Sequence, residues 1–433
     1  TTLFRSDMNM AKLLIIGSIA AGTSVGAKAR RNSEDLEITI YDRDEDISYS
    51  GCGIPYFVGG EVAELDELTP RDAAFFKKRY NIDVKTRHNV EAIDHETKTA
   101  TIRHLDSGET FTDTYDTLVF ATGASSIIPP LPGVDLENVF PVRNIRNADA
   151  IRRYVDAQAP KRAVIVGGGF IGLEMAEQLT YRGIEVTLVE RLAQVMPPLD
   201  VDMAKRVSDH LEANGVILRL GEAVASFEGE KTARAVVLAS GETIETDLVI
   251  LSVGVKPNTQ LAQEIGVTIG QTGAIAVNRQ MQTNIEGVYA VGDVAESFSL
   301  ITGQPLYRPL GSTANKMGRI AGMVITGEAI EHRGILGTGI FKAFDLTVAQ
   351  TGLTEKEARD AGYDIEVLHN IKPDRPEYLG GKEMVIKAIA DRNDGRVLGA
   401  QIVGPQGVDK RIDVLATAIS FKEKAEDLFH LDL

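Results

Sequence analysis

Cysteine is almost missing from this chain, which has one cysteine among 433 residues and no tryptophan. A single cysteine, Cys52, excludes an internal disulfide, a pair of redox thiols and a multi-thiolate metal site. Redox chemistry at Cys52 must therefore use an external sulfur or an oxidised form of its own sulfur. The seven histidines show no HExxH motif or other close ligand spacing, so we expect no bound metal.

Long apolar runs are absent too, because no run approaches the roughly 18 residues that a membrane span needs. The N-terminal residues show no basic segment followed by an apolar segment and a cleavage site. We set residues 1–10 aside as an upstream extension without apolar periodicity. The net charge of −16 argues against nonspecific nucleic-acid binding. We therefore expect a cytoplasmic protein that binds neither nucleic acid nor membranes.

Strand-like and helical patterns alternate along most of the chain, whose length suggests about three domains. Apolar runs at 13–16, 164–166 and 186–189 each adjoin glycine-rich turns or helical patterns, which is typical of parallel α/β layering. After about Gly334 the pattern changes to strands, a helical run at 354–361 and a final helix. The predicted fold class is α/β, with two Rossmann-like dinucleotide-binding domains and a C-terminal α+β domain.

The clearer of two glycine motifs is GGGFIG at 167–172, which lies between a predicted strand and a predicted helix. The glycines permit a tight turn, let the backbone approach a pyrophosphate and let helix and strand pack closely. Glu190 ends the next predicted strand and suits a ribose diol. Its charge would repel a 2′-phosphate and so favours NADH, although Arg191 could turn outward and accept one.

The first glycine motif, GSIAAG at 17–22, departs from the pattern because Ile19 replaces the middle glycine. Asp42 follows at the distance expected of a ribose acid, so a second dinucleotide site is predicted, with a purely structural turn as the alternative. The segment 116–123, ending in Thr122 and Gly123, is similar to a further FAD fingerprint. So is the segment 287–293, ending in Gly292 and Asp293.

Together with SYSGCGIPY at 48–56, these motifs resemble the single-cysteine branch of the pyridine nucleotide-disulfide oxidoreductase superfamily. That branch contains coenzyme A-disulfide reductases, persulfide reductases, NADH oxidases and NADH peroxidases. The resemblance implies FAD and NADH as cofactors, with NADPH possible, and a homodimer. It divides the chain into an FAD-binding domain in two parts, 10–146 and 273–330, an NAD(P)-binding domain, 147–272, and a dimerisation domain, 331–433.

The residues around Cys52 predict a sulfur at the start of a helix, where the dipole and free amides would lower the thiol pKa. An inert core cysteine is the alternative.

In the branch, peroxidases and many oxidases have a histidine at the position of Ala20, so the resemblance favours the disulfide-reducing members. Those members use tyrosines of the partner subunit; Tyr378 resembles one of them, and the printed sequence has no counterpart of the other. Arg31 matches a coenzyme A-phosphate contact, and Ser48 a residue of the active-site turn.

We therefore predict an FAD-dependent NAD(P)H oxidoreductase that reduces a small disulfide or persulfide, with coenzyme A disulfide favoured. An NADH oxidase or peroxidase acting through a Cys52 sulfenic acid and a nonenzymatic flavin and cysteine redox sensor remain open. The predicted catalytic residues are Cys52, Ser48 and Tyr378, the predicted substrate-binding residue is Arg31, and the predicted cofactor-binding residues are Gly17, Ala20, Gly22, Asp42, Thr122, Gly123, Gly167, Gly169, Gly172, Glu190, Gly292 and Asp293.

Overall fold

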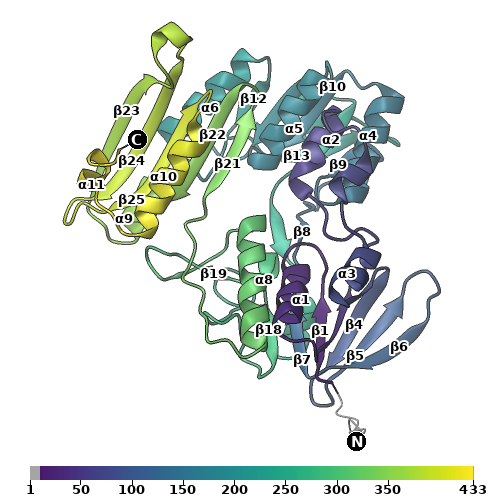
Figure 1. The fold of residues 1–433 in the computed structure, drawn as a ribbon. Helices are drawn as coiled ribbons and strands as arrows, with labels where there is room; N and C mark the ends of the chain where they lie inside the picture. Colours follow the sequence, from purple (N-terminus) through teal and green to yellow (C-terminus); the bar gives the residue numbers. More distant parts are fainter. Residues whose placement is uncertain (1–9, 433) are drawn as a thin grey trace, which may run out of the picture.

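Three five-stranded sheets organise the chain in the computed structural model, which describes residues 10–432 (Figure 1). Two of the sheets are parallel and the third is antiparallel. The N-terminal extension predicted at 1–10 lies outside the described residues except for Met10. No helix among residues 10–432 is long and apolar enough to cross a membrane.

The first parallel sheet surrounds the N-terminal strand, with the order β18-β7-β1-β2-β3. Its central strand reads Lys-Leu-Leu-Ile-Ile and is almost wholly buried, as expected of a parallel strand covered on both faces. The strands are β1 (Lys12–Ile16), β2 (Glu37–Tyr41), β3 (Asp83–Lys85), β7 (Thr117–Phe120) and β18 (Val288–Ala290). Two helices, α1 (Ala21–Asn32) and α8 (Gly311–Ile325), pack against each other beside it. An antiparallel insertion consists of β4 (His88–Asp94), β5 (Thr99–His104) and β6 (Thr110–Thr114).

The second parallel sheet repeats this plan, with the order β12-β11-β10-β16-β9. Its strands are β9 (Val139–Pro141), β10 (Arg162–Val166), β11 (Glu185–Glu190), β12 (Ile217–Leu220) and β16 (Leu248–Leu251). Its helices are α4 (Ile145–Gln158), α5 (Phe170–Tyr181) and α6 (Val201–Ala213). It too has an antiparallel insertion, formed by β13 (Val224–Gly229), β14 (Ala233–Leu238) and β15 (Thr243–Glu245).

The segment with the cysteine lies between the two parallel sheets. It contains the 3₁₀ helix η1 (Gly51–Gly53) and the short helix α2 (Ile54–Gly59). Although α2 precedes β7 in the chain, it packs against α4 and α5 of the second sheet (Figure 1). Ile54, Phe57 and Val58 join the apolar core of that sheet. The cysteine segment is therefore held against the second sheet by apolar packing.

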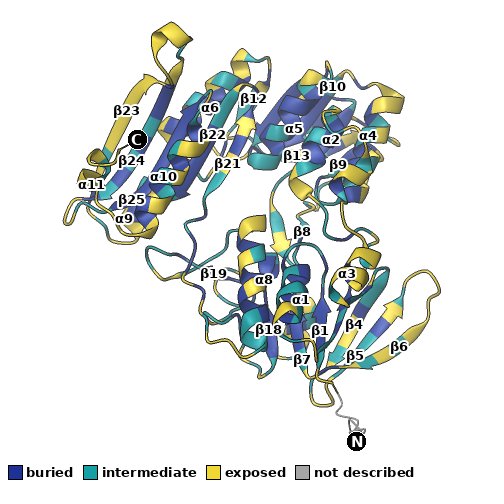
Figure 2. Cartoon of the chain, in the orientation of Figure 1, coloured by how far each residue is buried: buried dark blue, intermediate teal, exposed yellow. Residues whose placement is uncertain are grey.

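The third sheet is antiparallel, with the order β21-β22-β25-β24-β23. Its strands are β21 (Gly339–Ala343), β22 (Leu346–Gly352), β23 (Ile365–Pro373), β24 (Glu383–Asp391) and β25 (Val397–Gly404). The edge strand β23 is exposed over most of its length (Figure 2). The helices are α9 (Glu355–Asp360), α10 (Val408–Ser420) and α11 (Ala425–Phe429). The predicted single final helix is thus two helices, separated where Lys422 takes a positive φ.

The remaining elements connect these sheets. They are η2 (Leu65–Leu68), α3 (Ala73–Tyr80), β8 (Ala124–Ser126), β17 (Val255–Pro257), α7 (Gln260–Glu264), η3 (Gly292–Val294), β19 (Ser297–Phe298), β20 (Pro305–Leu306) and η4 (Glu377–Leu379). The fold class predicted from the sequence is confirmed. The four predicted domain bounds stay a prediction; β9 pairs in the second sheet although it precedes the bound at 146.

Candidate functional site

The first glycine turn, between β1 and α1, leaves no space for side chains at its ends. Gly17 has φ of +107°, and a Cβ there would lie 2.0 Å from the carbonyl oxygen of Ala121. A Cβ on Gly22 would lie 1.8 Å from the carbonyl oxygen of Gly17. Ala20 stands at the N-cap of α1 and no side chain caps the helix amides there. An anion such as a pyrophosphate fits this bare helix start.

Asp42, at the end of β2, is held by donors from this turn. Its Oδ2 accepts hydrogen bonds from the amide of Ser18 at 2.8 Å and from Ser18 Oγ at 2.6 Å. Its Oδ1 accepts the amide of Asp44 at 2.9 Å. Burial raises the pKa of Asp42, while the Ser18 hydroxyl and the two amides act to lower it. Sequence reasoning found Asp42 but missed Ser18.

The second turn, between β10 and α5, has the same geometry. Gly167 has φ of +109°, and a Cβ on Gly172 would lie 2.0 Å from the Gly167 carbonyl oxygen. Gly169 is the N-cap of α5, with no side-chain cap and open space around its Cα. Glu190 Oε2 accepts the amide of Gly168 at 2.7 Å, and its Oε1 accepts the amide of Leu192 at 2.8 Å. These residues fit a second dinucleotide.

The two further fingerprint segments meet groups that sequence reasoning did not find. Thr122 Oγ1 donates to the carbonyl oxygen of Asn258 at 2.8 Å, beside Gly123 with its φ of +64°. Asp293 follows Gly292, and its Oδ2 accepts Nη2 of Arg143 at 2.8 Å. Arg143 and Asp293 are 150 residues apart, so no local pattern could predict their pairing.

A buried hydroxyl without a partner lies beside Asp293. Ser297 is 3% exposed, and its Oγ has no hydrogen-bond partner among residues 10–432. With Asp293 and Tyr307 it lines a cavity of about 10 Å³, enough for one water-sized group. A free donor next to a carboxylate and the start of α8 fits a single polar atom of a cofactor such as a flavin.

Cys52 is an exposed thiol in η1, directly before α2. Ser48 precedes it with a positive φ of 51°, and the Ser48 amide donates to the Ser18 carbonyl oxygen at 3.1 Å. The turn that carries Cys52 is therefore hydrogen-bonded to the first glycine turn. The loop that joins Asp42 to this turn lines a polar cavity of about 420 Å³.

The predicted lowering of the Cys52 pKa is wrong. Neighbouring atoms desolvate the sulfur and raise the pKa, the negative charge of Glu174 raises it further, and only a backbone amide opposes them. The helix that follows the cysteine has six residues, so its dipole is small. Glu174 lies on α5, and its Oε1 accepts the hydroxyl of Tyr56 at 3.3 Å. Burial raises the pKa of Glu174 to about 7.

Tyr378 and Arg31 lie apart from these groups in the single chain. Tyr378 is in η4, between β23 and β24, and is 85% exposed. Arg31 is exposed at the end of α1, where its Nη2 lies 3.2 Å from the hydroxyl of Tyr80. Its neighbour Arg30 donates to backbone carbonyls, including that of Leu36.

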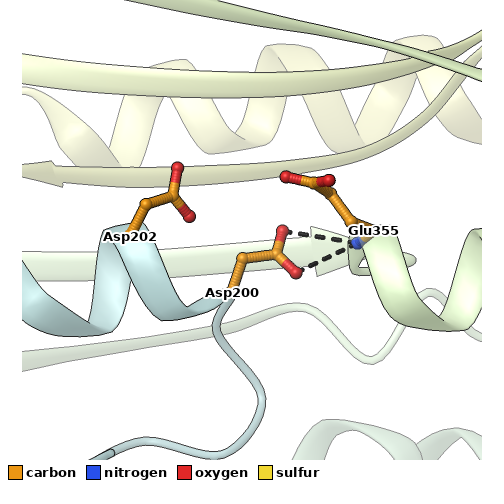
Figure 3. A group of neighbouring side chains, drawn as sticks. All are labelled: Asp200, Asp202 and Glu355. Carbon is orange, nitrogen blue, oxygen red and sulfur yellow. Dashed lines mark hydrogen bonds between the residues drawn. The ribbon is translucent and has the colours of Figure 1, made fainter.

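Three carboxylates, of Asp200, Asp202 and Glu355, gather where α6 meets the third sheet (Figure 3). Their centre is taken by Lys387, whose Nζ lies 3.1, 2.8 and 2.5 Å from them respectively. Burial alone would lower the pKa of Lys387, but these hydrogen bonds raise it. We call this group the Lys387 cluster. The ammonium group of Lys387 occupies the space between the three carboxylates, where a metal ion would otherwise fit.

Known proteins agree with this geometry. Residues 11–314 match the pyridine nucleotide-disulphide oxidoreductase family, and residues 339–431 match its dimerisation domain. The chain belongs to this family. It is therefore an oxidoreductase that uses FAD and NAD(P)H, and both predictions are confirmed. The match of the C-terminal sheet to a dimerisation domain also supports oligomerisation.

Three curated relatives and one solved structure are similar over nearly the whole chain. The NAD(P)H sulfur oxidoreductase (CoA-dependent) of Pyrococcus abyssi is 39% identical, covering 97% of this chain and 93% of the relative. The NADH oxidase of Methanocaldococcus jannaschii is 38% identical, covering 97% and 94%. The coenzyme A disulfide reductase of Staphylococcus haemolyticus is 33% identical, covering 98% and 95%.

The structure of an NAD-dependent persulfide reductase from A. fulgidus superposes with a TM-score of 0.94 at 39% identity, covering 98% of this chain and 79% of that one. These relatives carry names of both reductases and an oxidase, as the resemblance predicted. All are named as enzymes, so the comparisons give the redox-sensor alternative no support.

Proposed function

We propose that this protein uses NADH to reduce a small disulfide or persulfide through Cys52, with coenzyme A disulfide as the favoured substrate. The observation that carries the proposal is the place of Cys52: an exposed, solitary thiol in a turn that is hydrogen-bonded to the first glycine turn, directly before a helix packed on α5. The names of the reductase relatives support the choice of substrate class.

The proposed roles of the residues follow from their positions. The first turn with Asp42, and Asp293 with Arg143, hold FAD, while the second turn with Glu190 holds NADH. Bound FAD supplies the passage of two electrons between the nicotinamide and the sulfur. Glu190 favours NADH because its charge repels a 2′-phosphate.

Cys52 performs the sulfur chemistry as a thiolate. It attacks one sulfur of the disulfide, so that a Cys52–sulfur bond forms, the disulfide bond breaks, and the released thiolate takes up a proton. Two electrons from NADH then return the mixed disulfide to the Cys52 thiolate and a second free thiol. The net balance is one NADH, one proton and one disulfide consumed, with NAD⁺ and two thiols formed.

We further propose a cytoplasmic homodimer in which Tyr378 serves the active site of the partner subunit. The exposure of Tyr378, next to the exposed edge strand β23, supports this role. Arg31 would contact a phosphate of coenzyme A from its exposed position on α1.

Replacing Cys52 by serine tests the proposal. The Cys52→Ser variant should keep flavin reduction by NADH and lose turnover of coenzyme A disulfide or persulfide, since no second thiol can replace it. Stopped-flow spectra should show a long-wavelength thiolate-to-flavin band in the native protein only. Ser50→Ala, which changes an exposed side chain of the same turn, is the matched control and should keep turnover. Full disulfide turnover by Cys52→Ser would refute the proposal.

An NADH oxidase acting through a Cys52 sulfenic acid is the second candidate, because one of the similar relatives bears that name. Ala20 argues against it, since a methyl group cannot assist oxygen or peroxide chemistry. Parallel measurements of oxygen uptake and of disulfide reduction with the same native protein separate the two. Oxygen reduction that far exceeds disulfide reduction would favour the oxidase.

A further inference from the structure

Ser18 is fully buried and uses both of its donors on one carboxylate. Its amide and its hydroxyl reach the same oxygen, Oδ2 of Asp42, at 2.8 and 2.6 Å. Hydrogen bonds to an ionised acceptor are shorter and stronger than those between neutral groups. A carboxylate offers about four acceptor sites. Three protein donors, counting the amide of Asp44, fix the orientation of Asp42 and leave the remainder for a ligand hydroxyl.

The turn geometry alone does not require this hydroxyl. In the second turn the matching position is Gly168, which gives Glu190 only its amide. The two turns nevertheless share the same backbone path, with φ of +107° at Gly17 and +109° at Gly167. The Ser18 hydroxyl therefore adds an interaction with Asp42 to a turn that forms without it.

Ser18 also contacts the active-site turn. Its carbonyl oxygen accepts the amide of Ser48, four residues before Cys52, and Ser48 takes a left-handed φ of 51° that few non-glycine residues adopt. One buried residue thus connects the acid at the end of β2 to the turn that carries the thiol.

We propose that Ser18 is a positioning residue of the flavin site, whose hydroxyl holds the Asp42 carboxylate in the orientation that receives the ribose of FAD. The inference rests on the proposed role of Asp42. Burial works against an ionised Asp42, and the Ser18 hydroxyl is the first of the groups that oppose this effect. A ribose hydroxyl donates best to an ionised carboxylate with a fixed orientation.

The dissociation constant of FAD tests this role directly. Ser18→Ala should weaken FAD binding on the order of ten- to a hundred-fold, the range for loss of a hydrogen bond to a charged group. The rise in flavin fluorescence as FAD dissociates on dilution measures this dissociation constant. Ser18→Gly, which copies position 168, provides the same test if the alanine variant folds poorly.

Two further measurements complete the test. Ser252→Ala is the matched control, because the Ser252 hydroxyl donates to carbonyl oxygens beside the second turn and should not affect FAD affinity. In an Asp42→Ala background, Ser18→Ala should cause little further loss, since its partner is gone. Native FAD affinity in Ser18→Ala, or an equal loss in both backgrounds, would overturn the inference alone. Native affinity in Asp42→Ala would instead overturn the proposed role of Asp42.

Discussion

The strands of the two parallel sheets lie in the same spatial order, but the outer strand of each sheet comes from a different point in the chain. In the first sheet the outer strand, β18, is the last to appear in the chain, whereas in the second sheet the corresponding strand, β9, is the first. Each sheet also carries a three-stranded antiparallel insertion, which directly precedes β7 in the first sheet and β16 in the second. The comparison shows that the nucleotide-binding plan depends on strand order in space and tolerates different chain connections.

The two glycine turns show what this plan requires and what it leaves free. Both acids accept the amide of the residue after the first glycine and the amide two residues after the acid itself. Two other positions differ between the turns. Ser18 of the first turn matches Gly168 of the second. Ser24, which donates to Asn315, matches Glu174, whose charge acts on Cys52. Under the proposed function the shared features bind a dinucleotide, and the differences give each turn its own role.

Replacing a glycine by alanine in one glycine turn at a time should have the largest effect on cofactor binding. Gly22→Ala should abolish FAD binding and Gly172→Ala should abolish reduction by NADH while FAD stays bound, because each new Cβ would lie within 2.0 Å of its own turn's first carbonyl. The visible spectrum of the purified protein and the rate of flavin reduction measure the two outcomes. If either variant lost both functions, the assignment of one turn to each cofactor would be wrong.

The acid of the second turn should set the choice of nicotinamide nucleotide. Glu190→Gln removes the charge that faces a 2′-phosphate, so we expect kcat/KM to move about ten-fold or more from NADH toward NADPH. Steady-state kinetics with both nucleotides measure this ratio. Glu185→Gln, at the exposed start of the same strand, should leave it unchanged. A native protein that already prefers NADPH would contradict the role given to Glu190.

Glu174, which lies two residues after the last glycine of the second motif, should affect the pKa of the Cys52 thiol. Because the charge of Glu174 raises the pKa of Cys52, Glu174→Gln should lower that pKa and move the alkylation profile of the thiol to lower pH. Ser24→Ala, at the matching position of α1, is the control. The rate of iodoacetamide reaction against pH measures the shift, and an unchanged profile would show that Glu174 does not act on Cys52.

Glu174 also gives a stability signature with a definite sign. Its pKa is raised from 4.5 to about 7 by burial, so the folded protein keeps a proton that the unfolded chain releases in this range. Stability should therefore fall as pH rises from about 4.5 to 7, by at most about 3 kcal/mol. Denaturant unfolding at several pH values should show a flatter dependence for Glu174→Gln.

Copying Ser18 into the second turn should have the smallest effect. The φ of Gly168 is not positive, and a Cβ there would meet Glu190 at 3.3 Å, which a small movement of that side chain relieves. Gly168→Ser should therefore raise KM for NADH about three-fold or less and leave FAD affinity unchanged. A loss as large as that of Gly172→Ala would show that the turns differ by steric need rather than by hydrogen bonding.

Local sequence patterns predicted the parts of the fold that are local in the chain. The buried strands, both glycine turns and the acids Asp42 and Glu190 follow from periodicity and spacing over about 25 residues. Patterns of this length could not give the packing of α2 on α5, because α2 precedes β7 and its partner helix belongs to the second sheet. The wrong expectation for the Cys52 pKa has the same cause, since the atoms that desolvate the sulfur raise its pKa most and Glu174 of the partner helix adds to this, and both act through tertiary packing.

Groups that pair over long separations were out of reach for the same reason. Arg143 gives no sign in the sequence that Asp293 will be its partner, and Ser18 looks like any small residue of a glycine turn. The positions of Tyr378 and Arg31 relative to a substrate stay predictions, because both residues are exposed in the single chain.

The Lys387 cluster has a consequence for the order in which the chain folds. Lys387 meets Asp202 across 185 residues, and Gln401 meets Asp200 across 201. Such contacts close long loops and cannot form until nearly the whole chain has left the ribosome. Until then two aspartates at the start of α6 lack their counter-charge, and afterwards a lysine without solvent contact is held by three acids. The contact between α6 and the third sheet is thus complete only when the last strands of the chain are present.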